Sequence, residues 1–173
     1  MKNRLKTDIL TDRENIMQKN NTGFTLIELL AVVLIIGILV AIALPQYRRS
    51  IERAEAMEAL VNLRSLFDSA KRYKAANSQV PMQLNGLDIS FFDASADDSS
   101  TFNIGKFQYA FSATTVSVCR INGNYCFHFY YNHPTRGKDV LTCKLSSTNG
   151  KYDWLCEAIG TTNLGNNEYL LDR

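Results

Sequence analysis

The chain has 173 residues, of which 46% are hydrophobic and 21% are charged. That length is enough for one compact domain and one long helix. The 19 basic and 17 acidic side chains nearly cancel, which leaves a formal net charge of +2. Because nucleic-acid binding needs a clear basic excess, we expect no nucleic-acid partner.

Residues 1–23 form a polar, basic stretch ahead of a long apolar run. They hold five basic and three acidic side chains, so residues 24–173 carry 14 of each. The positive excess predicts that this stretch faces the cytoplasm. Starting at Met17 would leave only the short basic segment MQKNNTG, and we hypothesise that this is the true start.

The segment 24–45 is the element around which the rest of the chain is arranged. From Phe24 to Leu44 it has 21 residues, and Glu28 is the only charged one. A helix of this length rises about 30 Å, enough to cross the hydrocarbon core of a bilayer. A lone carboxylate is costly in lipid, so it indicates a functional site with a partner.

The motif GFTLIE at residues 23–28, followed by this apolar run, resembles the processing site of the type IV pilin family. Pseudopilins of type II secretion share the motif. The resemblance is tight over residues 23–73 and only architectural beyond them. It implies that residues 1–23 are a leader, that prepilin peptidase cleaves between Gly23 and Phe24, and that the same enzyme methylates the new amino terminus at Phe24.

The resemblance also implies how this helix assembles. Glu28 would neutralise the amino terminus of a neighbouring subunit, which fits the physics because a buried carboxylate and a buried ammonium cost less together than apart. The helix between Gly37 and Pro45 would loosen when subunits pack into a filament. Proline inside a helix removes one hydrogen bond, which makes Pro45 a weak point.

The segment 46–78 is the amphipathic half of the same helix. Its apolar positions step by four and three residues, which is one helical stripe: Ala56, Leu60, Leu63, Phe67 and Ala70. Charged residues, Glu52 among them, fill much of the remaining surface, and Asp68 is spaced to pair with Arg72. We expect the stripe to lie on a single sheet.

The segment 79–105 carries loop signals and is expected to connect helix and sheet. Pro81 disfavours helical geometry before it, so the helix should end near Asn77. Three acids, Asp93, Asp97 and Asp98, could hold calcium, but they lack the ordered spacing of a calcium loop. A solvated acidic loop is the favoured interpretation.

The segment 106–173 predicts an antiparallel sheet with a disulfide-stapled C-terminal region. Apolar residues alternate with polar ones from Phe107 to Phe111. Asn122-Gly123 predicts a hairpin turn whose register opposes Cys119 to Cys126, and Val116 and Val118 to Phe129 and Phe127.

Asn149-Gly150 predicts a second hairpin by the same reasoning. Its register opposes Leu145 to Trp154, Leu141 to Ala158 and Cys143 to Cys156. The last pair falls where the two backbones approach more closely.

Four cysteines allow three pairings. The two registers favour Cys119–Cys126 and Cys143–Cys156, and the resemblance places the second pair where pilins often carry their C-terminal bridge. Disulfides imply an oxidising compartment outside the inner membrane. A zinc site is the alternative, but the spacing contains no C-x2-C pair.

The sequence contains no motif for catalysis, a metal or a cofactor. His128 is read as an exposed strand residue and His133 as part of a turn, and neither belongs to a catalytic pattern. No glycine-rich phosphate loop or carboxylate pair is present. We therefore expect no enzyme activity.

The interpretation is an α+β, type IV pilin-like fold with four or five antiparallel strands. The expected function is a structural subunit of a type IV pilus-like filament. Its expected partners are identical or related subunits, prepilin peptidase, the inner-membrane assembly machinery and the bilayer, with the subunit in the inner membrane before assembly and in a surface pilus or periplasmic pseudopilus afterwards. The alternatives are a type II secretion pseudopilin and a single-span anchored domain that never polymerises. Two disulfides and the absent calcium loop favour the pilus.

Overall fold

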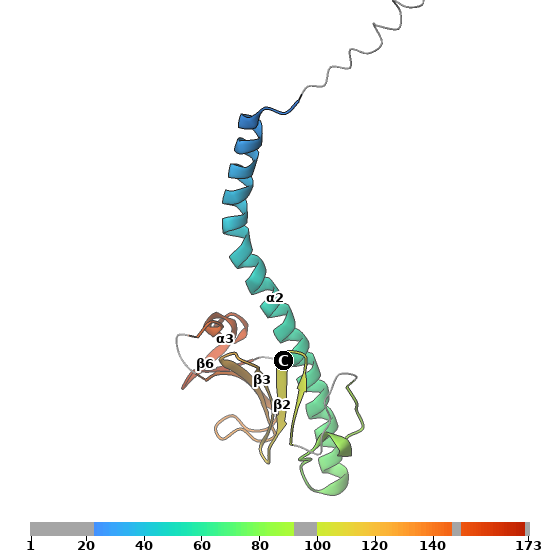
Figure 1. Cartoon of the computed structure of the whole chain (residues 1–173). Helices are drawn as coiled ribbons and strands as arrows, with labels where there is room; N and C mark the ends of the chain where they lie inside the picture. Colours follow the sequence, from blue (N-terminus) through green and yellow to red (C-terminus); the bar gives the residue numbers. More distant parts are fainter. Residues whose placement is uncertain (1–22, 92–99, 147–149, 172–173) are drawn as a thin grey trace, which may run out of the picture. The chain divides into compact units, whose positions relative to one another are not determined.

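A computed structural model describes residues 23–91, 100–146 and 150–171, and it divides the chain into two units that meet between Arg48 and Arg49 (Figure 1). The long helix α2 spans Leu26–Asn77, η1 is a short 3₁₀ turn at Leu84–Gly86, and α3 spans Asp153–Ile159. The strands are β1 (Thr101–Ile104), β2 (Phe107–Phe111), β3 (Thr115–Arg120), β4 (Tyr125–Tyr130), β5 (Val140–Leu145), β6 (Thr162–Gly165) and β7 (Glu168–Leu170).

The first unit contains the apolar part of α2. Every described residue up to Arg48 is exposed, including Leu, Ile and Val side chains on all sides of the helix. Pro45 lies inside the helix and has no N–H to donate to the carbonyl of Ala41. Gly37 is also helical, and a Cβ added there would meet nothing within 4 Å. Loosening between Gly37 and Pro45 stays a prediction.

The second unit is a single antiparallel sheet covered by a helix, which confirms the α+β class. The strand order is β1-β2-β3-β4-β5-β7-β6. The prediction of four or five strands was wrong, because the described residues form seven. β1 lies within the segment 79–105 that the sequence marked as a loop, and β6 and β7 come from a tail without strong strand signals.

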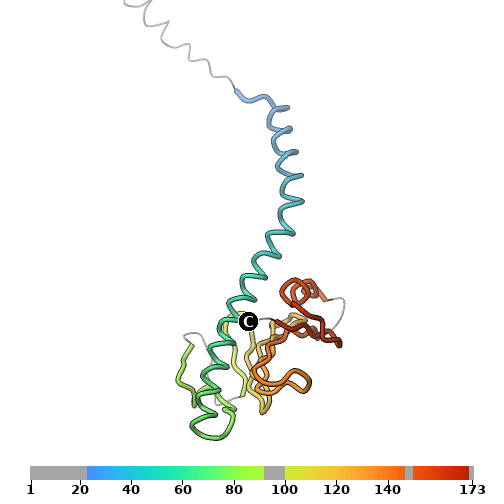
Figure 2. Tube along the Cα trace, turned by 180° about the vertical axis from the view of Figure 1, so that it is seen from behind, coloured from blue at the N-terminus to red at the C-terminus, as the bar shows by residue number. Residues whose placement is uncertain are grey.

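The amphipathic half of α2 packs on one face of this sheet, as Figures 1 and 2 show from opposite sides. All five residues of the predicted stripe, from Ala56 to Ala70, are at most 5% exposed. Phe67 stacks on Phe129 of β4 with ring centroids 3.8 Å apart, and on Tyr131 at 5.0 Å. The helical period therefore predicted the buried face correctly.

The first hairpin forms in the predicted register. Cys119 opposes Cys126, Val118 opposes Phe127 and Val116 opposes Phe129. Asn122 in the turn has φ 57°, the left-handed conformation that asparagine tolerates better than most residues.

The second hairpin does not form, and this prediction was wrong. β5 pairs with β4 and β7, so Leu145 opposes Tyr125 and Leu141 opposes Phe129. The segment expected to return as a strand is the helix α3, while Asn149 of the expected turn lies outside the described residues. The carboxylate of Asp153 accepts the N–H of Gly150 at 2.8 Å, a local bond that favours the start of a helix.

The last turns of α2 end where the sequence predicted, but Arg72 has a different partner. The helix ends at Asn77, and Ser78 follows with φ 59°. The expected ion pair between Asp68 and Arg72 is replaced by bonds from Arg72 to Asp88 at 2.7 and 2.9 Å. Hydrogen bonds from Arg72 and Ser69 lower the pKa of Asp88 to about 2. The sequence alone could not show this partner, because it lies 16 residues away.

A buried ion pair links α2 to the sheet. Glu52 is only 6% exposed, although its place among other charges suggested a surface residue. Arg120 of β3 donates to its two oxygens at 2.8 and 3.0 Å, and the hydroxyl of Tyr125 donates to one of them at 2.6 Å. The guanidinium carbon of Arg120 lies 5.4 Å from the ring centroid of Phe107 and 5.7 Å from that of Tyr152.

The protonation of Glu52 follows from these contacts. Burial raises the pKa of the Glu52 carboxyl, but the hydrogen bonds from Arg120 and Tyr125 outweigh that effect, so its pKa lies below the ordinary 4.5. A carboxyl whose pKa is lowered by folding stabilises the fold above its unfolded pKa. That stabilisation is lost as the pH falls through the folded-state pKa.

We therefore predict that Glu52→Gln lowers the free energy of unfolding near neutral pH by about 2 kcal/mol, because the buried Arg120 loses its charge-assisted hydrogen bonds to Glu52 and keeps only the longer ion pair to Oε2 of Glu55 at 3.4 Å. Urea unfolding of the full chain in detergent, followed by tryptophan emission, measures this. As the pH falls from neutral to below 4.5, the free energy of unfolding should decrease more in the native chain than in Glu52→Gln. The exposed Glu58→Gln is the control and should change stability by less than about 0.5 kcal/mol. Equal pH dependence in native chain and Glu52→Gln would contradict the assignment.

Candidate functional site

The amino-terminal end of α2 is capped by two side chains of the GFTLIE motif. The N–H and the hydroxyl of Thr25 both donate to Oε2 of Glu28 at 2.8 Å. The N–H of Glu28 donates back to Oγ1 of Thr25 at 3.3 Å. This reciprocal arrangement is a capping box, with threonine just before the first helical residue and glutamate at the third position.

The capping box gives Glu28 a local role that sequence reasoning missed. The T-x-x-E spacing was visible in the motif and is the signal that would have identified Thr25. Both partners lie in the same turn, so the carboxylate has hydrogen-bond donors before any other subunit arrives. Two donors reduce the cost of holding a carboxylate in an apolar segment.

The bond between Gly23 and Phe24 is accessible. Both residues precede the first turn of α2 and are exposed, with Phe24 86% exposed. A Cβ added at Gly23 would meet nothing within 4 Å. The fold of the described chain therefore does not itself require glycine at this position.

The apolar surface that follows has no cover within the protein. In the described residues, α2 is the one helix long and apolar enough to cross a membrane, and none of its most apolar window is buried. Exposed side chains such as Leu30, Ile35 and Leu39, at 57–61%, are spread along it. Burying a side chain of this kind is worth about 1.5–3 kcal/mol, so the surface strongly favours an apolar environment.

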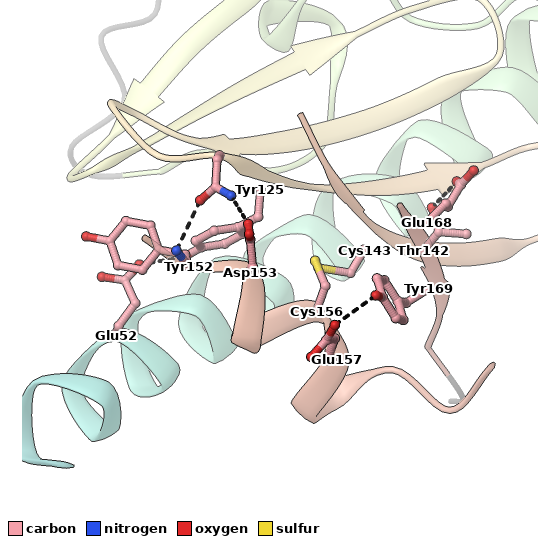
Figure 3. Close-up of a disulfide and its surroundings, with 11 residues drawn as sticks. Glu52, Tyr125, Thr142, Cys143, Tyr152, Asp153, Cys156, Glu157, Glu168 and Tyr169 are labelled. Carbon is pink, nitrogen blue, oxygen red and sulfur yellow. Dashed lines mark hydrogen bonds between the residues drawn. A yellow bond between two sulfur atoms is a disulfide. The ribbon is translucent and has the colours of Figure 1, made fainter. Parts of the chain in front are cut away.

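The four cysteines form two disulfides of unequal burial. Cys143 of β5 is joined to Cys156 of α3, and both are 0% exposed (Figure 3). Cys119 and Cys126 are joined across the β3–β4 hairpin and are half-buried. The first bridge holds a helix on the sheet, while the second links residues that the strand ladder already opposes.

The remaining candidate residues do not converge on a site. His128 is half-buried on β4 rather than exposed, and burial lowers its pKa. His133 is buried, and its Nδ1 lies 3.2 Å from the hydroxyl of Thr135. The described residues contain no group of three or more His, Cys, Asp or Glu able to hold a metal ion. The acids Asp93, Asp97 and Asp98 lie outside the described residues.

Comparison with known proteins gives matches centred on the amino-terminal helix. Residues 18–44 match the family described as the prokaryotic N-terminal methylation motif. The type IV major pilin protein PilA of Myxococcus xanthus is 49% identical over 53 residues, 31% of this chain and 24% of that protein. The type II secretion system core protein G of Aeromonas hydrophila is 34% identical over 73 residues, 42% of this chain and 51% of that protein.

One relative is similar over most of both chains. The fimbrial protein EcpC of Eikenella corrodens is 32% identical over 138 residues, 79% of this chain and 82% of that protein. The aligned residues thus cover about a quarter of PilA and about half of core protein G, but most of EcpC. No solved structure matches the chain significantly.

We predict that the two disulfides differ in stabilisation and in reactivity. Replacing Cys143 and Cys156 together by alanine should cost about 3 kcal/mol or more in urea unfolding, because the bridge closes a 13-residue separation and its sulfurs are buried. Replacing Cys119 and Cys126 together should cost less, about 2 kcal/mol, since the hairpin ladder persists. In a titration with dithiothreitol, thiol labelling and mass spectrometry should detect Cys119 and Cys126 first. Earlier labelling of Cys143 would contradict the burial argument.

Proposed function

The chain belongs to the type IV pilin and fimbrial protein family, and we propose that it is a structural subunit of a type IV pilus-like filament that polymerises through its amino-terminal helix. The observation that carries the proposal is the exposed apolar surface of α2 from Phe24 to Leu44. Lipid would cover this surface before assembly. Other subunits would cover it in the filament, so the same side chains serve both states.

Processing is the first step of the proposal. Prepilin peptidase would cleave the accessible bond between Gly23 and Phe24 and methylate the new amino terminus. The match of residues 18–44 to the methylation motif supports this step, and so does the exposure of both residues. Cleavage would leave Thr25 and Glu28 in place, so the helix would keep its capping box.

Assembly is the second step, and in it Glu28 would have two roles. Within its own chain it caps α2 through Thr25. Between chains its charge would pair with the amino terminus at Phe24 of a neighbouring subunit. The cap stabilises the helix in each subunit, whereas only the charge can attract the neighbour, so the two roles can be separated by substitution.

A type II secretion pseudopilus is the second candidate function. The similarity to core protein G supports it, but that alignment covers only 51% of the relative. The similarity to fimbrial protein EcpC covers 82% and favours a pilus subunit. Inner-membrane assembly machinery is a proposed partner in either case. The location would be a surface pilus in the first case and the periplasm in the second.

The proposal predicts a methylated amino terminus at Phe24. Mass spectrometry of the amino-terminal peptide should find it both in the membrane fraction and in material sheared from the cell surface. Methylated Phe24 in membranes alone would favour the pseudopilus. Gly23→Ala should reduce cleavage and Gly23→Val should abolish it, because the peptidase, and not the fold, requires the small residue. An intact Gly23–Phe24 bond in the native chain would overturn the proposal.

Three variants separate the cap from the charge of Glu28. Glu28→Gln retains a side chain that can close a capping box but removes the charge, and we predict normal cleavage and membrane insertion with little or no filament. Glu28→Ala removes both and should also fail to polymerise. Thr25→Val keeps the charge, loses the cap and should still form filaments, with α2 destabilised by about 1 kcal/mol. Electron microscopy and shearing yield measure assembly. Normal filaments from Glu28→Gln would refute the pairing.

A further inference from the structure

Basic and aromatic side chains meet at the beginning of the second unit. The guanidinium carbon of Arg49 lies 5.7 Å from the ring centroid of Trp154, the only tryptophan of the chain. Three residues before Trp154 in the chain, Nζ of Lys151 lies 5.2 Å from the ring centroid of Tyr152. We call these four residues the basic aromatic corner. Arg49 and Lys151 are exposed, and the two rings are half-buried.

The corner is held firmly on the sheet. The N–H of Tyr152 donates to Oδ1 of Asn124 at 3.2 Å, and the amide of Asn124 donates to the carboxylate of Asp153 (Figure 3). The disulfide from Cys156 to Cys143 fixes α3 one turn further on. Trp154 therefore has a defined position next to Arg49.

The position of Arg49 along α2 places the corner close to the membrane boundary. Leu44 is the last residue of the apolar run, and Arg49 follows five residues later in the same helix. At 1.5 Å per residue this separation is about 7.5 Å, which is within the headgroup layer. Tyr47, 64% exposed, lies between them, and exposed tyrosine and tryptophan concentrate at that layer. This distance is set by the helix and applies to Arg49.

The charge of the corner suits phosphate groups. Neither Arg49 nor Lys151 forms an ion pair among the described residues. The nearby acids are occupied: Glu52 binds Arg120, and Asp153 binds Asn124 and Gly150. Glu157, further along α3, accepts a hydrogen bond from the hydroxyl of Tyr169 at 3.3 Å. The corner therefore offers two cations and the amphipathic ring of Trp154, while the ring of Tyr152 contacts Arg120 and Tyr125.

We propose that the basic aromatic corner binds phospholipid headgroups on the outer face of the inner membrane before the subunit is assembled. This inference rests on the proposed membrane anchoring of α2. Arg49 and Lys151 contact lipid phosphates, and Trp154 lies at the level of the headgroups. The contact holds the second unit against the bilayer, and it must be released when the subunit leaves the membrane for the filament.

The single tryptophan makes the inference measurable. The full chain is reconstituted into phosphatidylcholine vesicles with and without phosphatidylglycerol. Co-flotation with the vesicles reports anchoring, and emission from Trp154 reports the corner. Lipids brominated near the headgroup should quench Trp154 more than lipids brominated near the chain ends. Acrylamide should quench Trp154 less in vesicles than in detergent. In 1 M salt, where screening acts within about 3 Å, bromolipid quenching should fall.

Variants test the role of charge. On phosphatidylglycerol vesicles, Arg49→Gln and Lys151→Gln should each lower the ratio of headgroup-bound to unbound molecules about fivefold, as measured by bromolipid quenching of Trp154. Lys151→Gln leaves the contact between Arg49 and Trp154 intact, so a loss there reports headgroup binding and not local packing. Lys138→Gln is the matched control. Lys138 is exposed beside Lys74, which is 25 residues or about 37 Å along α2 from Arg49, and it should have no effect.

The outcomes separate the two proposals. A chain that does not float with vesicles refutes the anchoring and, with it, the headgroup contact. A chain that floats while Trp154 is quenched equally by acrylamide in vesicles and in detergent, and not by bromolipids, refutes the headgroup contact alone. Protection of Trp154 in assembled filaments but not in vesicles assigns the corner to a second subunit and also refutes it.

Discussion

The packing of the second unit depends on a carboxylate that is buried between helix and sheet. Glu52 accepts hydrogen bonds from Arg120 of β3 and Tyr125 of β4. The apolar stripe of α2 supplies most of the burial, but hydrophobic contact is non-directional and tolerates sliding. A shift of one helical turn, about 5.4 Å, would break the hydrogen bonds that Arg120 and Tyr125 donate to Glu52. The ion pair thus fixes the position of the helix along the strands.

Two of the carboxylates of α2, Glu28 and Glu52, have different kinds of partner. Glu28 accepts hydrogen bonds from Thr25 in the same helical turn, so this contact uses no residue of the second unit. Glu52 is bonded by strands 68 and 73 residues away, which ties the second unit together. In the proposed filament only the first carboxylate gains a partner from another subunit. In that proposal the second keeps its partners within the globular unit.

The two disulfides have a similar division of roles. Cys119–Cys126 lies across a hairpin whose register the ladder has already set. Cys143–Cys156 joins a strand to α3, two elements without a shared ladder. The buried bridge also holds the segment that carries Trp154 beside Arg49. Fixing this short helix therefore matters both for the core and for the basic aromatic corner.

Local sequence patterns were sufficient to predict the helix, its buried face and one hairpin of this protein. The motif at residues 23–28, the extent of α2, its buried stripe and the β3–β4 register all follow from spacing within one element or one hairpin. The burial of Glu52, its contact with Arg120 and the helical state of Asp153–Ile159 were decided by the tertiary structure. The register argument favoured the pairing of Cys143 with Cys156 through a hairpin that does not exist. The physical reason is range: periodicity and turn chemistry act over a few residues, whereas buried charge and strand order depend on partners that only folding brings together.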